Sequence, residues 1–261
     1  MKILKKIEFH IEKINKSLKK NGLKGAVKKI AMKFVRLPFT IFDKTMVLFK
    51  VKSYLNQKSQ RFWEKSSYTF LADAAYYDRQ ETALREIISK IECDEGNTEN
   101  AVDIGCGNGR FTFIISEKFK YVYGYDLSQK LISLAHQTAS ENNIKNVEFS
   151  QQDLNKKFPS GIYDLVSCMG VTSAIIDEKM YIELISNLLS VTKLGGYLIT
   201  KDTLSIEDNV NFNSGEYAAI YRNQKHYENC FQEAGVKCVL MINLNDDPKR
   251  KLVNNIYLWR H

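Results

Sequence analysis

The pattern of apolar and polar residues becomes regular after about residue 97, where short apolar runs alternate with amphipathic segments. The runs predict strands that end at Ile104, Asp126, Ser150, Met169 and Thr200, separated by helices over 109–119, 128–142 and 179–192. A helix over 79–91 precedes the first strand, and a polar loop over 206–219 follows the fifth. A helix to Ala234 and two strands over 236–244 and 252–259 complete the pattern. Such alternation is typical of a parallel sheet with helices on both faces. We therefore expect an α/β fold with a doubly wound, mostly parallel sheet of seven strands.

The first 60 residues follow a different pattern. One helical stripe of apolar residues runs from Ile3 to Leu18 and a second from Leu23 to Phe34, with lysines on the other faces. The glycine after Asn21 and the proline after Leu37 are expected to end these two helices. We therefore expect a basic amphipathic helical extension over residues 1–60 and a second domain, with an N-terminal lid, over residues 61–261.

Charge separates the same two parts of the chain. The net charge is +8 overall, but residues 1–60 carry +13 and the remaining residues carry −5. A basic segment on an acidic body favours contact with an anionic membrane surface or with nucleic acid. Its lysines alternate with aliphatic residues rather than with stacking aromatic residues, which favours the membrane surface. The alternative is that both helices dock their apolar faces on the body.

Composition narrows the class of protein. No apolar run approaches the roughly 20 residues that span a bilayer, so no transmembrane segment is expected. The five cysteines contain no Cys-x-x-Cys pair, which indicates neither a disulfide framework nor a zinc site. We expect a cytoplasmic protein, with residues 1–60 available to the cytoplasmic face of a membrane.

The turn after the first strand carries the strongest chemical signal. Glycines occupy positions Gly105, Gly107 and Gly109, where the backbone can turn with no Cβ in the way. The dinucleotide fingerprint needs its third glycine at the place of Arg110, which argues against NAD. Asp103 precedes the turn, and Asp126 closes the next apolar run. A carboxylate at Asp126 can accept both hydroxyls of a ribose.

With this turn, with Asp126 and with Asp153 after the third strand, the chain resembles the class I S-adenosylmethionine-dependent methyltransferases from about Glu81 to the C-terminus. The resemblance implies S-adenosylmethionine as cofactor, S-adenosylhomocysteine as product and an antiparallel last strand. It implies that Asp153 accepts a hydrogen bond from the adenine amine. The full implied set of cofactor-binding residues is Asp103, Gly105, Cys106, Gly107, Asn108, Asp126, Leu127, Asp153, Leu154 and Met169, with Tyr77 from the lid.

The acceptor pocket would be formed by the lid and by the segment after the fifth strand. The candidate acceptor residues are Tyr76, Tyr217, Tyr221 and Arg222, and no metal ligands are expected. Asp202 lies at the end of the fifth strand and is the candidate for a base that takes the proton of a hydroxyl acceptor.

These residues favour O-methylation of a small molecule or glycan, with a cell-envelope or lipid-linked sugar as one option. The strand over 162–169 ends without the Asn or Asp, two prolines and aromatic residue typical of enzymes that methylate the amino groups of nucleic acid bases. RNA methylation and a non-catalytic cofactor-binding scaffold stay open as alternatives, and so does the oligomeric state.

Overall fold

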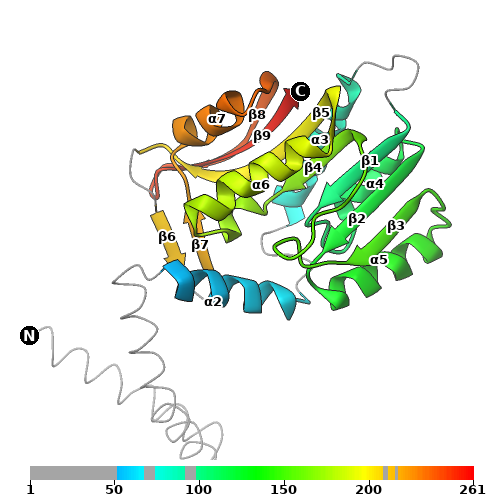
Figure 1. Ribbon diagram of the computed structural model, residues 1–261, viewed down its shortest axis with the longest axis horizontal. Coiled ribbons are helices and arrows are strands. Elements are labelled where there is room, and N and C mark those ends of the chain that lie inside the picture. Colours follow the sequence, from blue (N-terminus) through cyan, green and yellow to red (C-terminus); the bar gives the residue numbers. More distant parts are fainter. Residues whose placement is uncertain (1–51, 68–73, 92–97, 208–210, 215–216) are drawn as a thin grey trace, which may run out of the picture. The chain divides into compact units, whose positions relative to one another are not determined.

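A computed structural model of the chain describes residues 52–67, 74–91, 98–207, 211–214 and 217–261 (Figure 1). These residues belong to one compact unit, Lys52–His261. The two amphipathic stripes expected between residues 3 and 34 lie outside the described residues. The domain boundary expected between residues 60 and 61 falls inside helix α2 (Lys52–Glu64), whose Leu55 is buried, so this whole helix belongs to the compact unit.

The main sheet has seven strands in the order β3-β2-β1-β4-β5-β9-β8. Their bounds are β1 Asn100–Ile104, β2 Tyr121–Asp126, β3 Val147–Gln151, β4 Tyr163–Met169, β5 Thr192–Ser205, β8 Lys237–Asp247 and β9 Leu252–Arg260. Strands β1 to β5 pair in parallel, whereas β9 is antiparallel to both β5 and β8. Strand β4 is buried at every residue, as expected for a central strand covered on both faces. The predicted fold class is confirmed.

Helices cover both faces of this sheet. Helices α3 (Ala74–Ser89) and α4 (Arg110–Ser116) share one apolar cluster with the sheet, and α6 (Glu178–Ser190) and α7 (Gln224–Glu233) share another with its opposite face. Helix α5 (Gln129–Glu141) packs on β3 and β2. Helix α2 runs along the lower edge of the sheet in Figure 1, next to β7. The parallel strands end at this edge, so α2 lies over the place where such sheets bind ligands.

Two elements differ from the sequence prediction. Helix α3 begins at Ala74 and not at Arg79, so Tyr76 and Tyr77 lie in its first turn. The segment expected to be a polar loop over 206–219 contains a two-stranded sheet, β6 (Asn211–Ser214) and β7 (Ala218–Tyr221). The first three residues of β7, Ala218, Ala219 and Ile220, are all buried, which accounts for a strand here in place of a loop.

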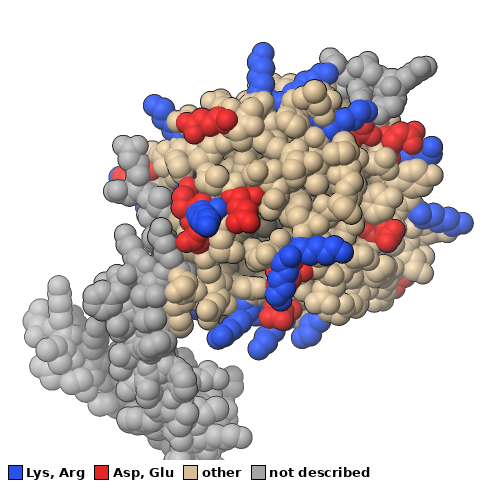
Figure 2. Space-filling model, in the orientation of Figure 1, with Lys and Arg blue, Asp and Glu red and all other residues tan. Residues whose placement is uncertain are grey.

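The surface of the described residues carries mixed charges. On the face drawn in Figure 2, Lys and Arg side chains are interspersed with Asp and Glu, and no single sign covers a continuous area. Within the described parts of the chain, no helix combines the length and apolar character needed to cross a bilayer.

Asp164 connects β4 to the start of β1. Its Oδ2 accepts hydrogen bonds from the backbone N–H groups of Glu99 and Asn100, each at 3.0 Å, and its Oδ1 accepts one from Lys193 Nζ at 2.8 Å. We expect Asp164→Ala to lower the free energy of unfolding by about 1–3 kcal/mol, because two backbone donors lose their acceptor. Lys193→Ala removes an ion pair whose lysine is 41% exposed and should cost less, about 0–1 kcal/mol. Urea denaturation measures both, and equal losses would contradict this role of Asp164.

Candidate active site

A cavity of about 710 Å³ lies at the carboxyl ends of the parallel strands. The glycine turn after β1, the residues after β2, β3 and β4, and the outer part of β5 line one side of it. Helix α2, the first turn of α3, and the β8–β9 region line the other side. All the predicted cofactor residues except Asp103 line this cavity, and Tyr76, Tyr217 and Tyr221 line it as well.

The glycine turn is held to the neighbouring strand by backbone hydrogen bonds. The N–H groups of Gly105 and Cys106 both donate to the carbonyl oxygen of Tyr125, at 2.7 and 3.0 Å. Gly105 and Gly107 have φ values of 75° and 57°, in the left-handed region that favours glycine. A Cβ on Gly105 would lie 2.3 Å from Val171 Cγ2, whereas a Cβ on Gly107 would meet nothing within 4 Å. Gly105 is therefore required by packing, and Gly107 leaves the backbone open to the cavity.

Asp126 supports the same turn from the end of β2. Its Oδ2 accepts the N–H of Gly107 at 2.9 Å, and its Oδ1 accepts the N–H of Ser128 at 2.8 Å. Burial raises the pKa of this carboxyl, while the backbone hydrogen bonds act in the opposite direction. Because each carboxylate oxygen can accept more than one hydrogen bond, Asp126 can hold the turn and still bind a ligand in the cavity.

Asp103 lies beneath the turn and not in the cavity. Its side chain is buried, and its Oδ2 accepts a hydrogen bond from Thr112 Oγ1 at 2.7 Å. Burial raises the pKa of this carboxyl to about 6. The predicted contact between Asp103 and a cofactor is therefore not supported, and its role in the structure is to hold α4 against β1.

Asp153 lies in the cavity wall next to α2. Its Oδ2 accepts a hydrogen bond from Gln60 Nε2 at 3.1 Å and pairs with Lys156 Nζ at 3.1 Å. The sequence prediction missed Asn56, Ser59 and Gln60 in this wall, because it assigned residues up to 60 to the extension. The apolar and aromatic residues of α2 were the signal that could have placed it in the domain.

The aromatic residues of the predicted lid line the cavity from two sides. Tyr76 Oη donates to Asn254 Oδ1 at 2.9 Å, and the Lys201 ammonium lies 5.3 Å from the centre of the Tyr76 ring. The Tyr217 ring lies 5.4 Å from that of Trp63. The lid is thus built from α2, α3 and the segment that leads into β7.

Asp202, the predicted base, does not line the cavity. Its neighbours Lys201 and Thr203 do, and since successive side chains of a strand point to opposite faces, Asp202 points away. Its Oδ1 accepts the N–H of Ser173 at 3.2 Å and its Oδ2 the hydroxyl of Tyr227 at 3.3 Å, while burial raises its pKa to about 6. The prediction of Asp202 as a base is not supported. Lys201 and Thr203 are the residues of β5 that face the ligand.

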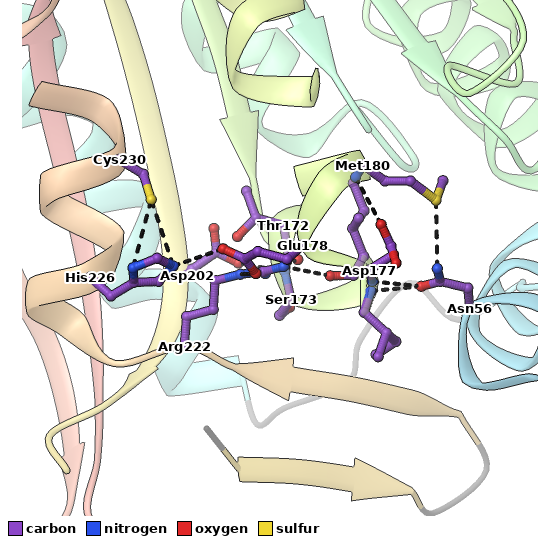
Figure 3. Close-up of polar contacts among 12 residues, drawn as sticks. Asn56, Thr172, Ser173, Asp177, Glu178, Met180, Asp202, Arg222, His226 and Cys230 are labelled. Carbon is purple, nitrogen blue, oxygen red and sulfur yellow. Dashed lines mark hydrogen bonds and ion pairs between the residues drawn. The ribbon is translucent and has the colours of Figure 1, made fainter. Parts of the chain in front are cut away.

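Arg222 is also outside the cavity, contrary to its predicted contact with an acceptor. Its guanidinium donates to Glu178 Oε2 at 3.0 Å and to the carbonyl oxygens of Thr172 and Ile175 at 3.0 and 2.9 Å (Figure 3). It also lies 3.7 Å above the Tyr181 ring. Ser173, Ala174 and Ile175 line the cavity, so Arg222 shapes its wall by holding the short helix η1 (Thr172–Ala174).

Two family models match the chain. One is described as a methyltransferase domain and matches residues 95–255, which include six strands of the main sheet and the first four residues of β9. The chain belongs to this family. The other, described as tRNA (uracil-5-)-methyltransferase, matches residues 5–156 and ends before β4. It therefore leaves out β4, β5, β7 and the β8–β9 region, which supply much of the outer cavity wall.

Known proteins resemble this methyltransferase domain at low identity. A probable (S)-tetrahydroprotoberberine N-methyltransferase from Papaver bracteatum is 24% identical over 191 residues, which cover 72% of this chain and 49% of that protein. The chain spans about half or less of the length of the first curated relatives that it matches.

Solved structures share the fold. The N-methyltransferase NodS from Bradyrhizobium japonicum with S-adenosylhomocysteine has a TM-score of 0.59 and 15% identity, over 79% of this chain and 98% of that one. Magnesium protoporphyrin IX methyltransferase from Synechocystis with bound S-adenosylmethionine has a TM-score of 0.56 and 20% identity, over 84% of this chain and 97% of that one.

Gly105 and Gly107 should respond differently to substitution by alanine. Gly105→Ala forces a Cβ into Val171 and also places alanine in the left-handed region, so it should lower the free energy of unfolding by about 1–3 kcal/mol for the clash in addition to about 1–2 kcal/mol for the backbone. Gly107→Ala meets no atom and should cost about 1–2 kcal/mol for its left-handed backbone, but it should weaken binding of S-adenosylmethionine. Urea denaturation and calorimetry separate the two effects. Full cofactor affinity in Gly107→Ala would show that the backbone there is not approached closely.

Asp126 should be needed for cofactor affinity. Asp126→Ala removes a charged acceptor from the cavity, and at about 1.5–3 kcal/mol for hydrogen bonds to a charged group the affinity should fall at least tenfold. Glu148→Ala is the matched control, because Glu148 is an exposed acid of β3 outside the cavity. Calorimetric titration with S-adenosylhomocysteine measures both variants. Unchanged affinity in Asp126→Ala would remove the ribose assignment.

Proposed function

We propose that the chain is an S-adenosylmethionine-dependent methyltransferase that acts on a hydroxyl group of a small molecule or glycan. In this proposal Asp126 accepts the ribose hydroxyls, and Asp153 accepts the adenine amine. The glycine turn from Gly105 to Asn108 approaches the methionine part of the cofactor. Leu127, Leu154 and Met169 flank it, and Tyr77 covers it. Family membership and the position of these residues around one cavity support this assignment.

The class of methyl acceptor is inferred from the residues that line the outer part of the cavity. Three tyrosines line it together with amide and hydroxyl side chains: Tyr76, Tyr217, Tyr221, Thr203, Asn245 and Asn254. The charged side chains of Lys201, Asp247 and Arg250 line it as well. Aromatic rings pack on the apolar face of a ligand, and a few fixed polar groups set its orientation. Asn254 is fixed by its hydrogen bond from Tyr76. This combination suits a ligand with several hydroxyl groups, such as a sugar.

The chain's residues would act mainly by alignment. The sulfonium methyl group is already activated, so holding the acceptor oxygen in line with carbon and sulfur supplies much of the rate, in favourable cases roughly 7–11 kcal/mol. Helix α2 and the first turn of α3 would keep water from the reacting atoms. Since Asp202 lies outside the cavity, we assign no base to the reaction.

N-methylation of a small amine is a second candidate. The Papaver relative and NodS are both named N-methyltransferases. A neutral amine attacks with its own lone pair and needs no strong base, which agrees with the position of Asp202 outside the cavity. RNA methylation is less favoured because the tRNA model ends before β4 and the face in Figure 2 has no continuous basic area.

Incubation of cell extracts with the full chain and isotope-labelled S-adenosylmethionine, followed by mass spectrometry, should yield a labelled small molecule or glycan. With that acceptor, Asn254→Ala should lower kcat/KM between twofold and tenfold, because a neutral hydrogen bond is worth about 0.5–1.5 kcal/mol. Asn243→Ala is the control, as Asn243 is an exposed residue of β8 outside the cavity. Isotope label in RNA would favour an RNA methyltransferase. Cofactor binding without any labelled product would favour the scaffold.

We also propose that the basic extension binds an anionic membrane surface, which would suit a lipid-linked or cell-envelope acceptor. Lysines near such a surface contribute about 1 kcal/mol each, so a few of them suffice for binding. The full chain should sediment with vesicles that contain anionic lipid, and less so at high salt. A fragment that begins at Lys52, where the compact unit begins, should remain in the supernatant and still bind cofactor. If neither form sediments and the fragment aggregates, the extension docks on the body instead.

A further inference from the structure

Three side chains with metal-binding atoms meet at the junction of α6 and α7. His226 and Cys230 lie one turn apart on α7, and Glu178 is the first residue of α6 (Figure 3). Their ligand atoms all lie within 4.8 Å of one another. His226 Nε2 is 2.7 Å from Glu178 Oε1 and 3.7 Å from Cys230 Sγ. A thiol, an imidazole and a carboxylate thus face one point from two helices.

These distances approach those of a zinc site. Zinc binds sulfur at about 2.3 Å and nitrogen or oxygen at about 2.0–2.2 Å in a tetrahedral arrangement, which places sulfur and nitrogen about 3.6 Å apart. The distance from Cys230 Sγ to His226 Nε2 is close to this value. The same geometry needs about 3.4 Å between nitrogen and oxygen, so the hydrogen bond from His226 to Glu178 would open by less than 1 Å.

The surroundings hold the carboxylate in place. Arg222 donates to Glu178 Oε2, which leaves Oε1 directed at His226. A hydrogen bond of this kind to the second oxygen of a ligating carboxylate is a common feature of metal sites. Cys230 is buried, whereas His226 and Glu178 are about half exposed, so an ion can reach the group from solvent.

The ligand set is negatively charged. A thiolate and a carboxylate carry a charge of −2, with the imidazole neutral, and the Arg222 guanidinium beside Glu178 offsets part of it. Burial and the nearby carboxylates of Glu178 and Glu233 raise the pKa of the Cys230 thiol. Metal binding would therefore release the thiol proton, as it does wherever a cysteine becomes a ligand. We propose that Glu178, His226 and Cys230 bind one zinc ion, with water as the fourth ligand.

The sequence did not indicate this group of side chains, and no metal ligands were expected from it. Its two local members follow a His-x-x-x-Cys pattern, and the third lies in another helix far earlier in the chain. None of the three residues lines the active-site cavity. Zinc would therefore join α6 to α7, and Glu178 would extend this support through Arg222 to the wall at η1.

The test uses the full chain without a histidine tag, stripped of metal with a chelator and then titrated with Zn²⁺ and with Co²⁺. We expect one ion per chain, a charge-transfer band from a cobalt–thiolate bond, and a higher melting temperature with zinc. Cys230→Ser should abolish the band, and His226→Ala should lower the affinity for zinc at least tenfold. Cys238→Ser is the control, because Cys238 lies on β8 outside the group and its loss should change nothing.

Two results would overturn the proposal: no stoichiometric zinc binding by the full chain, or equal binding by the full chain and His226→Ala. The side chain of His226 is about half exposed, so this variant tests the site even if Cys230→Ser fails to fold. Neither cofactor nor acceptor enters these measurements. Their outcome is therefore independent of the proposed methyl transfer.

Discussion

The attachment of the glycine turn to β2 is the constraint on which the active site depends. Two successive N–H groups of the turn share the carbonyl oxygen of Tyr125, and the N–H of Gly107 binds Asp126. The turn cannot move away from β2 without losing all three hydrogen bonds. It cannot move toward β4 either, because Gly105 already lies against Val171. Backbone hydrogen bonds to β2, the Asp126 carboxylate and the Val171 side chain therefore fix the floor of the cavity, and this part of the site tolerates little change in geometry.

The opposite wall is held in a different way. The buried Arg222 supplies three donors to the segment after β4 and to Glu178. Asn56 of α2 accepts the N–H groups of Ile176 and Asp177 from the other side, at 2.7 and 3.2 Å. Side chains from α2 and from the end of β7 thus hold this wall between them. A single substitution at Arg222 would change the shape of the cavity without removing a group that touches the ligand.

The sequence predicted the parts of the molecule that local patterns encode. Alternating apolar runs placed every strand of the main sheet, and glycine spacing with Asp126 located the turn, because both signals lie within a few residues of one another. Asp202 was assigned to the cavity from its place at a strand end, although the alternation of β5 puts Lys201 and Thr203 there. The role of Arg222 depends on Glu178 and Thr172, more than 40 residues earlier in the chain, and no local pattern reports such a contact.

This division has a consequence for how such a domain changes its acceptor. The floor needs only a glycine turn, one carboxylate at Asp126 and backbone groups whose positions follow from the fold, which agrees with similarity to relatives at only 24% identity. The outer wall is made of side chains from α2, α3, β7 and the β8–β9 region, which contact one another through side-chain hydrogen bonds, such as that from Tyr76 to Asn254, and through ring contacts, such as that between Trp63 and Tyr217. Each of these side chains can be replaced without disturbing the floor. Acceptor choice can therefore change while cofactor binding is retained, and for this reason the acceptor has to be inferred from the outer wall of this chain and not from the names of its relatives.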